Sequence, residues 1–129
     1  NRDLGFSKED RIENLRRVGE VSKILQDSGI FVLASFIAPF AKDRQNIKDL
    51  FNEEDFIEIY VKCDLDSLQK RDTKVFYKKA LSGEIPNFTG INSPYDEPES
   101  PDLIIDTAKL NIEQSAKIII DFLEKKHAI

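Results

Sequence analysis

Two groups of residues have the composition to bind an anion. Arg11 and Asn14 are three positions apart, so in a helix they share one face, where a guanidinium and an amide could hold a phosphate, a sulfate or an adenine edge. The second group is the run KRDTKVFYKK at 70–79, which has five cations and two aromatic rings. Such a run could close over a polyphosphate and exclude water. For both groups the alternative is a solvated helix surface.

Two phenylalanines add aromatic surface to segments expected to be loops. Phe6 stands in DLGF and Phe88 in NFTGI. Each ring could stack on a purine base, and each could equally anchor its loop to the hydrophobic core. The residues alone leave both alternatives open.

Several common kinds of site are missing from the sequence. The five glycines are at 5, 19, 29, 83 and 90, and none precedes a lysine, so there is no G-x-x-x-x-G-K-[ST] phosphate loop. One cysteine, Cys63, and one histidine, His127, exclude an intrachain disulfide, a zinc cluster and a Ser-His-Asp set. A net charge of −5 argues against a broad nucleic-acid-binding surface. The sequence has neither the pattern of a signal peptide nor an apolar stretch long enough to span a membrane. We therefore expect a soluble, cytoplasmic protein.

Helical and strand patterns alternate along the first half of the chain. Ser7 and Gly29 are suited to begin and end a helix over about 8–28. The apolar run IFVLAS at 30–35 predicts a strand buried on both faces. A surface helix is expected over 41–51, in which Asp43 and Arg44 are predicted to form a first-turn ion pair with a structural role.

The second half repeats this alternation around one long segment. FIEIYV at 56–61 predicts a second strand, and Asp64 can cap a short helix that follows it. Residues 71–101 have little periodicity and four prolines, as expected of a functional loop such as a lid. LIID at 103–106 predicts a third strand, and Asn111 with Gln114 predicts the start of a last helix.

Strands that alternate with helices predict an α/β fold in which a parallel sheet is flanked by helices. We expect one domain over 1–129, with its ligands beyond the carboxyl ends of the strands. Three strands make a thin sheet, and the sequence begins with Asn1 and contains no methionine. We therefore expect a first strand, upstream of this segment, that belongs to the same domain.

Three long runs carry a family resemblance. NRDLGFSKEDRIENLRRVGEV, ASFIAPFAKDR and RDTKVFYKKALSGEIPNFTGINSPYDEPESPD, in this order, resemble the adenylylsulfate (APS) kinases. These are P-loop NTPase-like enzymes that phosphorylate the 3′-hydroxyl of adenylyl sulfate with MgATP, in sulfate assimilation. The motifs are long and irregular, so the resemblance is far more specific than a short glycine pattern.

The resemblance implies a role for particular side chains. Phe6 would stack on the adenine of adenylyl sulfate, with Phe88 as the opposite ring of one clamp. Polar contacts to the same ligand would come from Arg11 and Asn14. The remaining residues implied to line this pocket are Ile37, Ala38, Lys74 and Asn87. On the ATP side, Arg71 would approach the nucleotide and Leu110 would border its adenine.

This sequence departs from the family pattern in two places. Many bacterial members read FISP, with a serine associated with a phosphoserine intermediate, where Ala38 stands here. Because alanine has no hydroxyl, direct transfer from ATP is the expected route. In the lid, the usual K-G-L-Y is replaced by Lys74-Val75-Phe76-Tyr77, which puts a β-branched residue in place of a flexible glycine.

The resemblance also implies parts that these 129 residues do not include. The phosphate loop and the acidic segment that positions Mg²⁺ would lie upstream, so no catalytic residue is expected here and the fragment alone should be inactive. Implied partners are ATP and adenylyl sulfate, a homodimer, and a fused or associated ATP sulfurylase, with neither nucleic acid nor membrane. The alternatives are another small-molecule P-loop kinase, for nucleosides, shikimate or gluconate, and a non-catalytic nucleotide-binding module.

Overall fold

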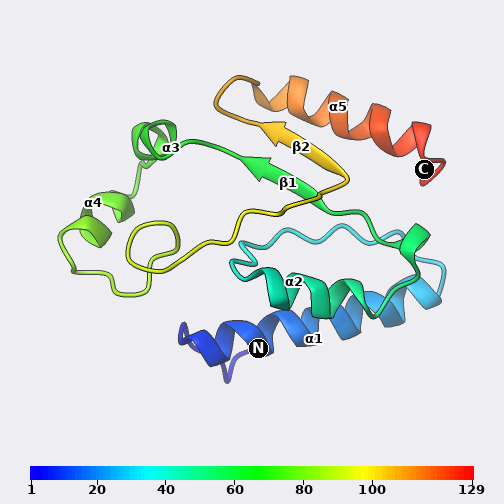
Figure 1. The fold of residues 1–129 in the computed structure, drawn as a ribbon, viewed down its shortest axis with the longest axis horizontal. Coiled ribbons are helices and arrows are strands. Elements are labelled where there is room, and N and C mark those ends of the chain that lie inside the picture. The colour runs from blue at the N-terminus through cyan, green and yellow to red at the C-terminus, as the bar shows by residue number, and fades with distance from the viewer. The chain divides into compact units, whose positions relative to one another are not determined.

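A computed structural model describes all residues from 1 to 129. The chain forms two compact units, each built from two stretches of sequence (Figure 1). The first unit contains residues 1–56 and 79–97, and the second contains residues 57–78 and 98–129. None of the helices combines the length and hydrophobicity needed to cross a bilayer.

The first unit is organised around two packed helices, α1 (Lys8–Asp27) and α2 (Ala41–Lys48) (Figure 1). The predicted start of α1 is confirmed, because the Ser7 hydroxyl accepts a hydrogen bond from the Asp10 amide at 3.1 Å. Its predicted end at Gly29 is confirmed by a φ of +80°. The helices meet at Gly19, where an added Cβ would lie 3.3 Å from a side-chain carbon of Ile47 in α2. A short 3-10 turn, η1 (Glu53–Asp55), follows α2.

The strand predicted at 30–35 is wrong. Residues 30–40 have no regular secondary structure, and among them Phe31 and Leu33 are exposed. A strand requires a second backbone that offers hydrogen bonds along its length, and the 129 described residues supply none to this segment. The apolar composition therefore indicated a tendency to be buried, but it could not supply the partner.

The second unit contains the sheet. Strand β1 (Ile59–Lys62) pairs in parallel with β2 (Leu103–Asp106), with Ile59 opposite Leu103. The Asp102 carboxylate accepts from the Glu58 amide at 2.9 Å, which continues the pairing beyond the first residue. The predicted α/β class with a parallel sheet is confirmed, although β1 begins three residues later than expected.

Three further helices complete the described elements. Helix α3 (Leu65–Arg71) is capped by Asp64 as predicted. Helix α5 (Ile112–Lys125) begins with a capping box of Asn111 and Gln114, also as predicted, and runs back in the direction opposite to β2 (Figure 1). Helix α4 (Phe76–Leu81) lies inside the segment that we expected to be irregular. In the second unit, Ile105 of β2 and Leu123 of α5 are buried and form its core.

Candidate functional site

The guanidinium of Arg11 joins three segments of the first unit. Its Nε donates to the Phe6 carbonyl at 3.1 Å, its Nη1 donates to the Thr89 hydroxyl at 3.1 Å, and its Nη2 donates to the Asn87 carbonyl. The loop before α1 and the loop at 87–89 therefore meet at the first turn of that helix. The structure thus brings together Phe6, Arg11 and Asn87, which the sequence analysis assigned to one pocket.

Phe6 and Phe88 differ in burial. The Phe6 side chain is 86% exposed, so its role as a core anchor is excluded. Phe88 is half-buried, and it follows Asn87, whose φ is +58°. An exposed ring on a loop held by Arg11 offers a free aromatic face, which is the requirement for stacking on a base.

Asn92 shapes the loop that carries Asn87 and Phe88. Its side-chain amide donates to the Ile85 carbonyl at 2.9 Å and to the Ala80 carbonyl at 3.3 Å, while its Oδ1 accepts from the Phe88 amide at 2.6 Å. Both donors and the acceptor of the amide are therefore used within the loop and the end of α4. The sequence alone does not indicate this role of Asn92, because only the fold shows which carbonyls lie around its side chain.

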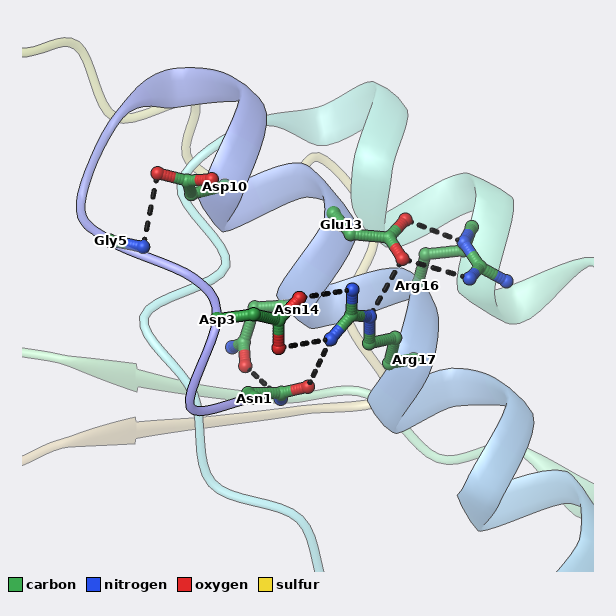
Figure 2. Close-up of polar contacts among 8 residues, drawn as sticks. All are labelled: Asn1, Asp3, Gly5, Asp10, Glu13, Asn14, Arg16 and Arg17. Atoms are coloured by element: carbon green, nitrogen blue, oxygen red, sulfur yellow. Dashed lines mark hydrogen bonds and ion pairs between the residues drawn. The ribbon is translucent and has the colours of Figure 1, made fainter.

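A network of charged side chains holds the chain's first residues against α1. Figure 2 shows Arg17 between Asp3, to which it donates two bonds of 2.8 Å, and Glu13, to which its Nε donates at 2.7 Å. Hydrogen bonds from Arg17 lower the pKa of Asp3 to about 2. Those from Arg16 and then Arg17 lower the pKa of Glu13 to about 2.

Asn14 belongs to the same face of α1 as this network. Its Oδ1 accepts a hydrogen bond from the Asn1 side chain (Figure 2). The Asp10 carboxylate accepts from the Gly5 amide at 3.1 Å. The residues that precede Phe6 are consequently tied to α1.

The turn at Ile37 and Ala38 lies before α2. Ile37 is 68% exposed, and Ala38 has a φ of +40°. The ion pair predicted for Asp43 and Arg44 does not form. Arg44 instead donates to the Ala38 carbonyl at 2.8 Å and to the Asp96 carbonyl at 2.7 Å. Asp43 is only 8% exposed, and its Oδ2 has no hydrogen-bond partner.

In the second unit, Arg71 lies at the carboxyl ends of both strands. Its guanidinium contacts the Sγ of Cys63, just after β1, at 3.8 Å, and donates to the carbonyl of Thr107, just after β2. Leu110 follows in the same turn, where its amide donates to the Asp106 carbonyl at 3.1 Å. Both residues predicted for the ATP side thus lie at the sheet edge where parallel α/β folds bind ligands.

Lys74 and Val75 form a tight turn in the second unit. The Asp72 carboxylate accepts from the amides of Lys74 at 3.1 Å and Tyr77 at 2.7 Å. Between them Val75 has a φ of +59°, a region that a β-branched residue rarely occupies. Glycine, the residue expected at this position from the resemblance, would adopt it without strain.

The described residues do not group three or more His, Cys, Asp or Glu side chains where they could hold a metal ion. Residues 1–129 therefore contain no carboxylate cluster that could hold the Mg²⁺ expected with ATP. The fold and the sites together define an α/β protein with one cationic side chain, Arg71, at the carboxyl ends of the parallel strands and another, Arg11, at the first turn of α1.

Comparison with known proteins identifies the family to which this α/β protein belongs. The family described as "Adenylylsulphate kinase" matches residues 1–106, and the chain belongs to this family, which has the P-loop NTPase fold. It is 55% identical over 128 residues to the adenylyl-sulfate kinase of Geotalea uraniireducens, covering 99% of this chain and 62% of that protein. It is 51% identical over 129 residues to the enzyme of Oceanobacillus iheyensis, covering 100% of this chain and 65% of that protein.

A solved structure agrees with this assignment. The APS kinase CysC of Mycobacterium tuberculosis, in complex with AMPPNP and APS, has a TM-score of 0.88 and 42% identity to this chain. The match covers 96% of this chain and 72% of that one. The chain spans less than two thirds of the length of the curated relatives named above, 62% and 65%.

Proposed function

We propose that the natural protein carrying this sequence transfers the γ-phosphate of ATP to the 3′-hydroxyl of adenylyl sulfate, giving 3′-phosphoadenylyl sulfate. The observation that carries the proposal is the position of Arg11, whose guanidinium contacts both the Phe6 loop and the loop of Asn87 and Thr89. Membership of the adenylylsulphate kinase family supports the reaction. The relative from Mycobacterium tuberculosis, whose structure is a complex with AMPPNP and APS, supports the two substrates.

In this proposal Arg11 exchanges partners when the sulfonucleotide binds. Its three present acceptors are two carbonyls and a hydroxyl, all uncharged. An anionic phosphosulfate group would make stronger, charge-assisted hydrogen bonds to the same guanidinium. Phe6 would stack on the adenine opposite Phe88, and Asn14 would exchange its bond with Asn1 for one with the ligand. Ile37 and the backbone at Ala38 would line the same pocket, and Lys74 would contact the ligand from the lid.

On the ATP side, Arg71 and Leu110 would border the nucleotide at the carboxyl edge of the sheet. Arg71 would neutralise charge on the phosphates, and most of the rate enhancement would come from positioning and charge neutralisation, as in other phosphoryl transfers. Mg²⁺ would arrive with ATP. Since Ala38 lacks a hydroxyl, transfer would be direct. A homodimer, an ATP sulfurylase partner and a cytoplasmic location remain predictions.

The test is an assay of acceptor choice. The natural protein is incubated with MgATP and, in separate reactions, adenylyl sulfate, 3′-deoxyadenylyl sulfate, nucleosides, shikimate or gluconate, and ADP release is followed. We expect ADP with adenylyl sulfate and none with the 3′-deoxy analogue. Phosphorylation of one of the other acceptors would favour a different small-molecule kinase. Nucleotide binding without ADP release in any reaction would favour a non-catalytic module.

A further inference from the structure

The turn at Ala38 is held in a conformation that its own residue disfavours. An L-residue with a positive φ, here +40°, persists only where surrounding contacts fix it. Hydrophobic burial covers one side of this turn only, because Pro39 is buried whereas Ile37 is 68% exposed. Polar contacts to the turn come from α2 and from the segment near Asp96.

Four hydrogen bonds connect these segments around one guanidinium. Arg44 donates to the Ala38 carbonyl at 2.8 Å and to the Asp96 carbonyl at 2.7 Å. In return, the Asp96 amide donates to the Pro39 carbonyl at 2.8 Å, and the Asp96 Oδ2 accepts from the Ala41 amide at 3.0 Å. The Nη1 and Nη2 atoms of Arg44 thus hold the two carbonyls at a fixed separation. The single ammonium of a lysine lacks this planar fork of donors.

We propose that Arg44 and Asp96 are positioning residues for the sulfonucleotide pocket: they hold the Ala38 turn in its strained conformation and anchor to it the end of the segment that carries Phe88. This rests on the proposed function, since Ile37 and Ala38 are assigned to the pocket there. Arg44 and Asp96 would act through this turn and not by contact with the substrate. Loss of either side chain would leave the rings and cations in place but would free the turn of Ile37 and Ala38, which is proposed to line the pocket.

The experiment compares Arg44→Ala and Arg44→Lys with the wild type in the natural protein, at saturating MgATP and varied adenylyl sulfate. Because each variant loses a charge-assisted contact to a strained turn, we expect the KM for adenylyl sulfate to rise about tenfold or more, about 1.4 kcal/mol. The KM for ATP should stay within about twofold. Lys42→Ala is the matched control, since Lys42 is an exposed cation in the same turn of α2 and its loss should leave both constants unchanged within about twofold.

A second background separates positioning from general destabilisation. Glycine adopts a positive φ without strain. In the Ala38→Gly background the conformation of the turn should therefore depend less on the hydrogen bonds from Arg44. Arg44→Ala should there raise the KM for adenylyl sulfate by no more than about threefold, whereas loss of a merely structural contact would have the same effect in both backgrounds. An equal rise in both backgrounds, or an unchanged KM in Arg44→Ala, would overturn the proposal.

Amide hydrogen exchange distinguishes this result from failure of the proposed function. The Ala41 amide donates to the Asp96 carboxylate and the Asp96 amide donates to the Pro39 carbonyl, so Arg44→Ala should accelerate the exchange of both amides about tenfold or more. If the wild type does not phosphorylate adenylyl sulfate, the proposed function fails, and unchanged protection of these two amides would still overturn the positioning role. If Arg44→Ala does not fold, Arg44→Lys in the two backgrounds gives the same comparison.

Discussion

Replacement of Val75 by glycine should change the free energy of unfolding little. The same substitution at Val61, in the same unit, should lower it. Val75 has a φ of +59° and is 46% exposed. Relief of the backbone strain should stabilise the fold by about 1–3 kcal/mol. Against this stand about 0.5–1 kcal/mol for the greater flexibility of glycine and roughly 1 kcal/mol for the lost half-buried side chain. The free energy of unfolding should therefore stay within about 1 kcal/mol of the wild type.

Val61 provides the matched control for this prediction. It lies in β1 of the same unit, is 61% exposed, and its extended backbone has no strain to release. Val61→Gly should lower the free energy of unfolding by about 2 kcal/mol, from the glycine cost, the lost burial and the lower strand propensity. Urea denaturation followed by far-ultraviolet circular dichroism measures both variants. An equal loss of stability in the two would refute the assignment of strain to Val75.

Four further predictions follow from the site. Phe88→Ala should weaken adenylyl sulfate binding by about 1–3 kcal/mol if a base stacks on the ring; unchanged affinity in calorimetry would make Phe88 a core anchor. Asn92→Ala removes three hydrogen bonds, so exchange of the Phe88 amide should accelerate by at least about tenfold, and unchanged exchange would contradict the role of Asn92. Because its folded pKa of about 2 lies below the ordinary 3.8, Asp3 should stabilise the fold at neutral pH and lose this contribution as the pH falls towards 2. Thermal unfolding of wild type and Asp3→Asn should therefore differ at pH 7 and converge near pH 2, and a constant difference would contradict the ion pair with Arg17. The 129 residues alone should release no ADP from MgATP and adenylyl sulfate, since no Gly-Lys pair occurs among them, and robust turnover would refute this.

Local signals in the sequence predicted the helices well. The N-caps Ser7, Asp64 and Asn111 each accept from an amide three residues ahead, so a short window of sequence contains the whole interaction. Helix α4 was not predicted, and the reason is again a property of the local sequence. Its six residues, Phe76–Leu81, are too few to show a helical period.

Non-local contacts could not be read in this way. The apolar run at 30–35 predicted a strand, but strand pairing depends on a partner that the run itself does not specify. Arg44 was assigned to its neighbour Asp43, whereas its acceptor at Asp96 lies 52 residues further along the chain. The resemblance placed Phe6, Arg11 and Asn87 in one pocket, and only the fold showed that Arg11 contacts the other two segments directly.

The most direct test of the central proposal is the position of the transferred phosphate. The natural protein is incubated with MgATP and adenylyl sulfate, and the sulfonucleotide product is isolated and examined by phosphorus nuclear magnetic resonance, with Arg11→Ala as the matched variant. We predict a new phosphate on the 3′-oxygen, formed by the wild type and strongly reduced in Arg11→Ala. An unmodified sulfonucleotide, or equal product from both proteins, would contradict the assignment of this pocket to adenylyl sulfate.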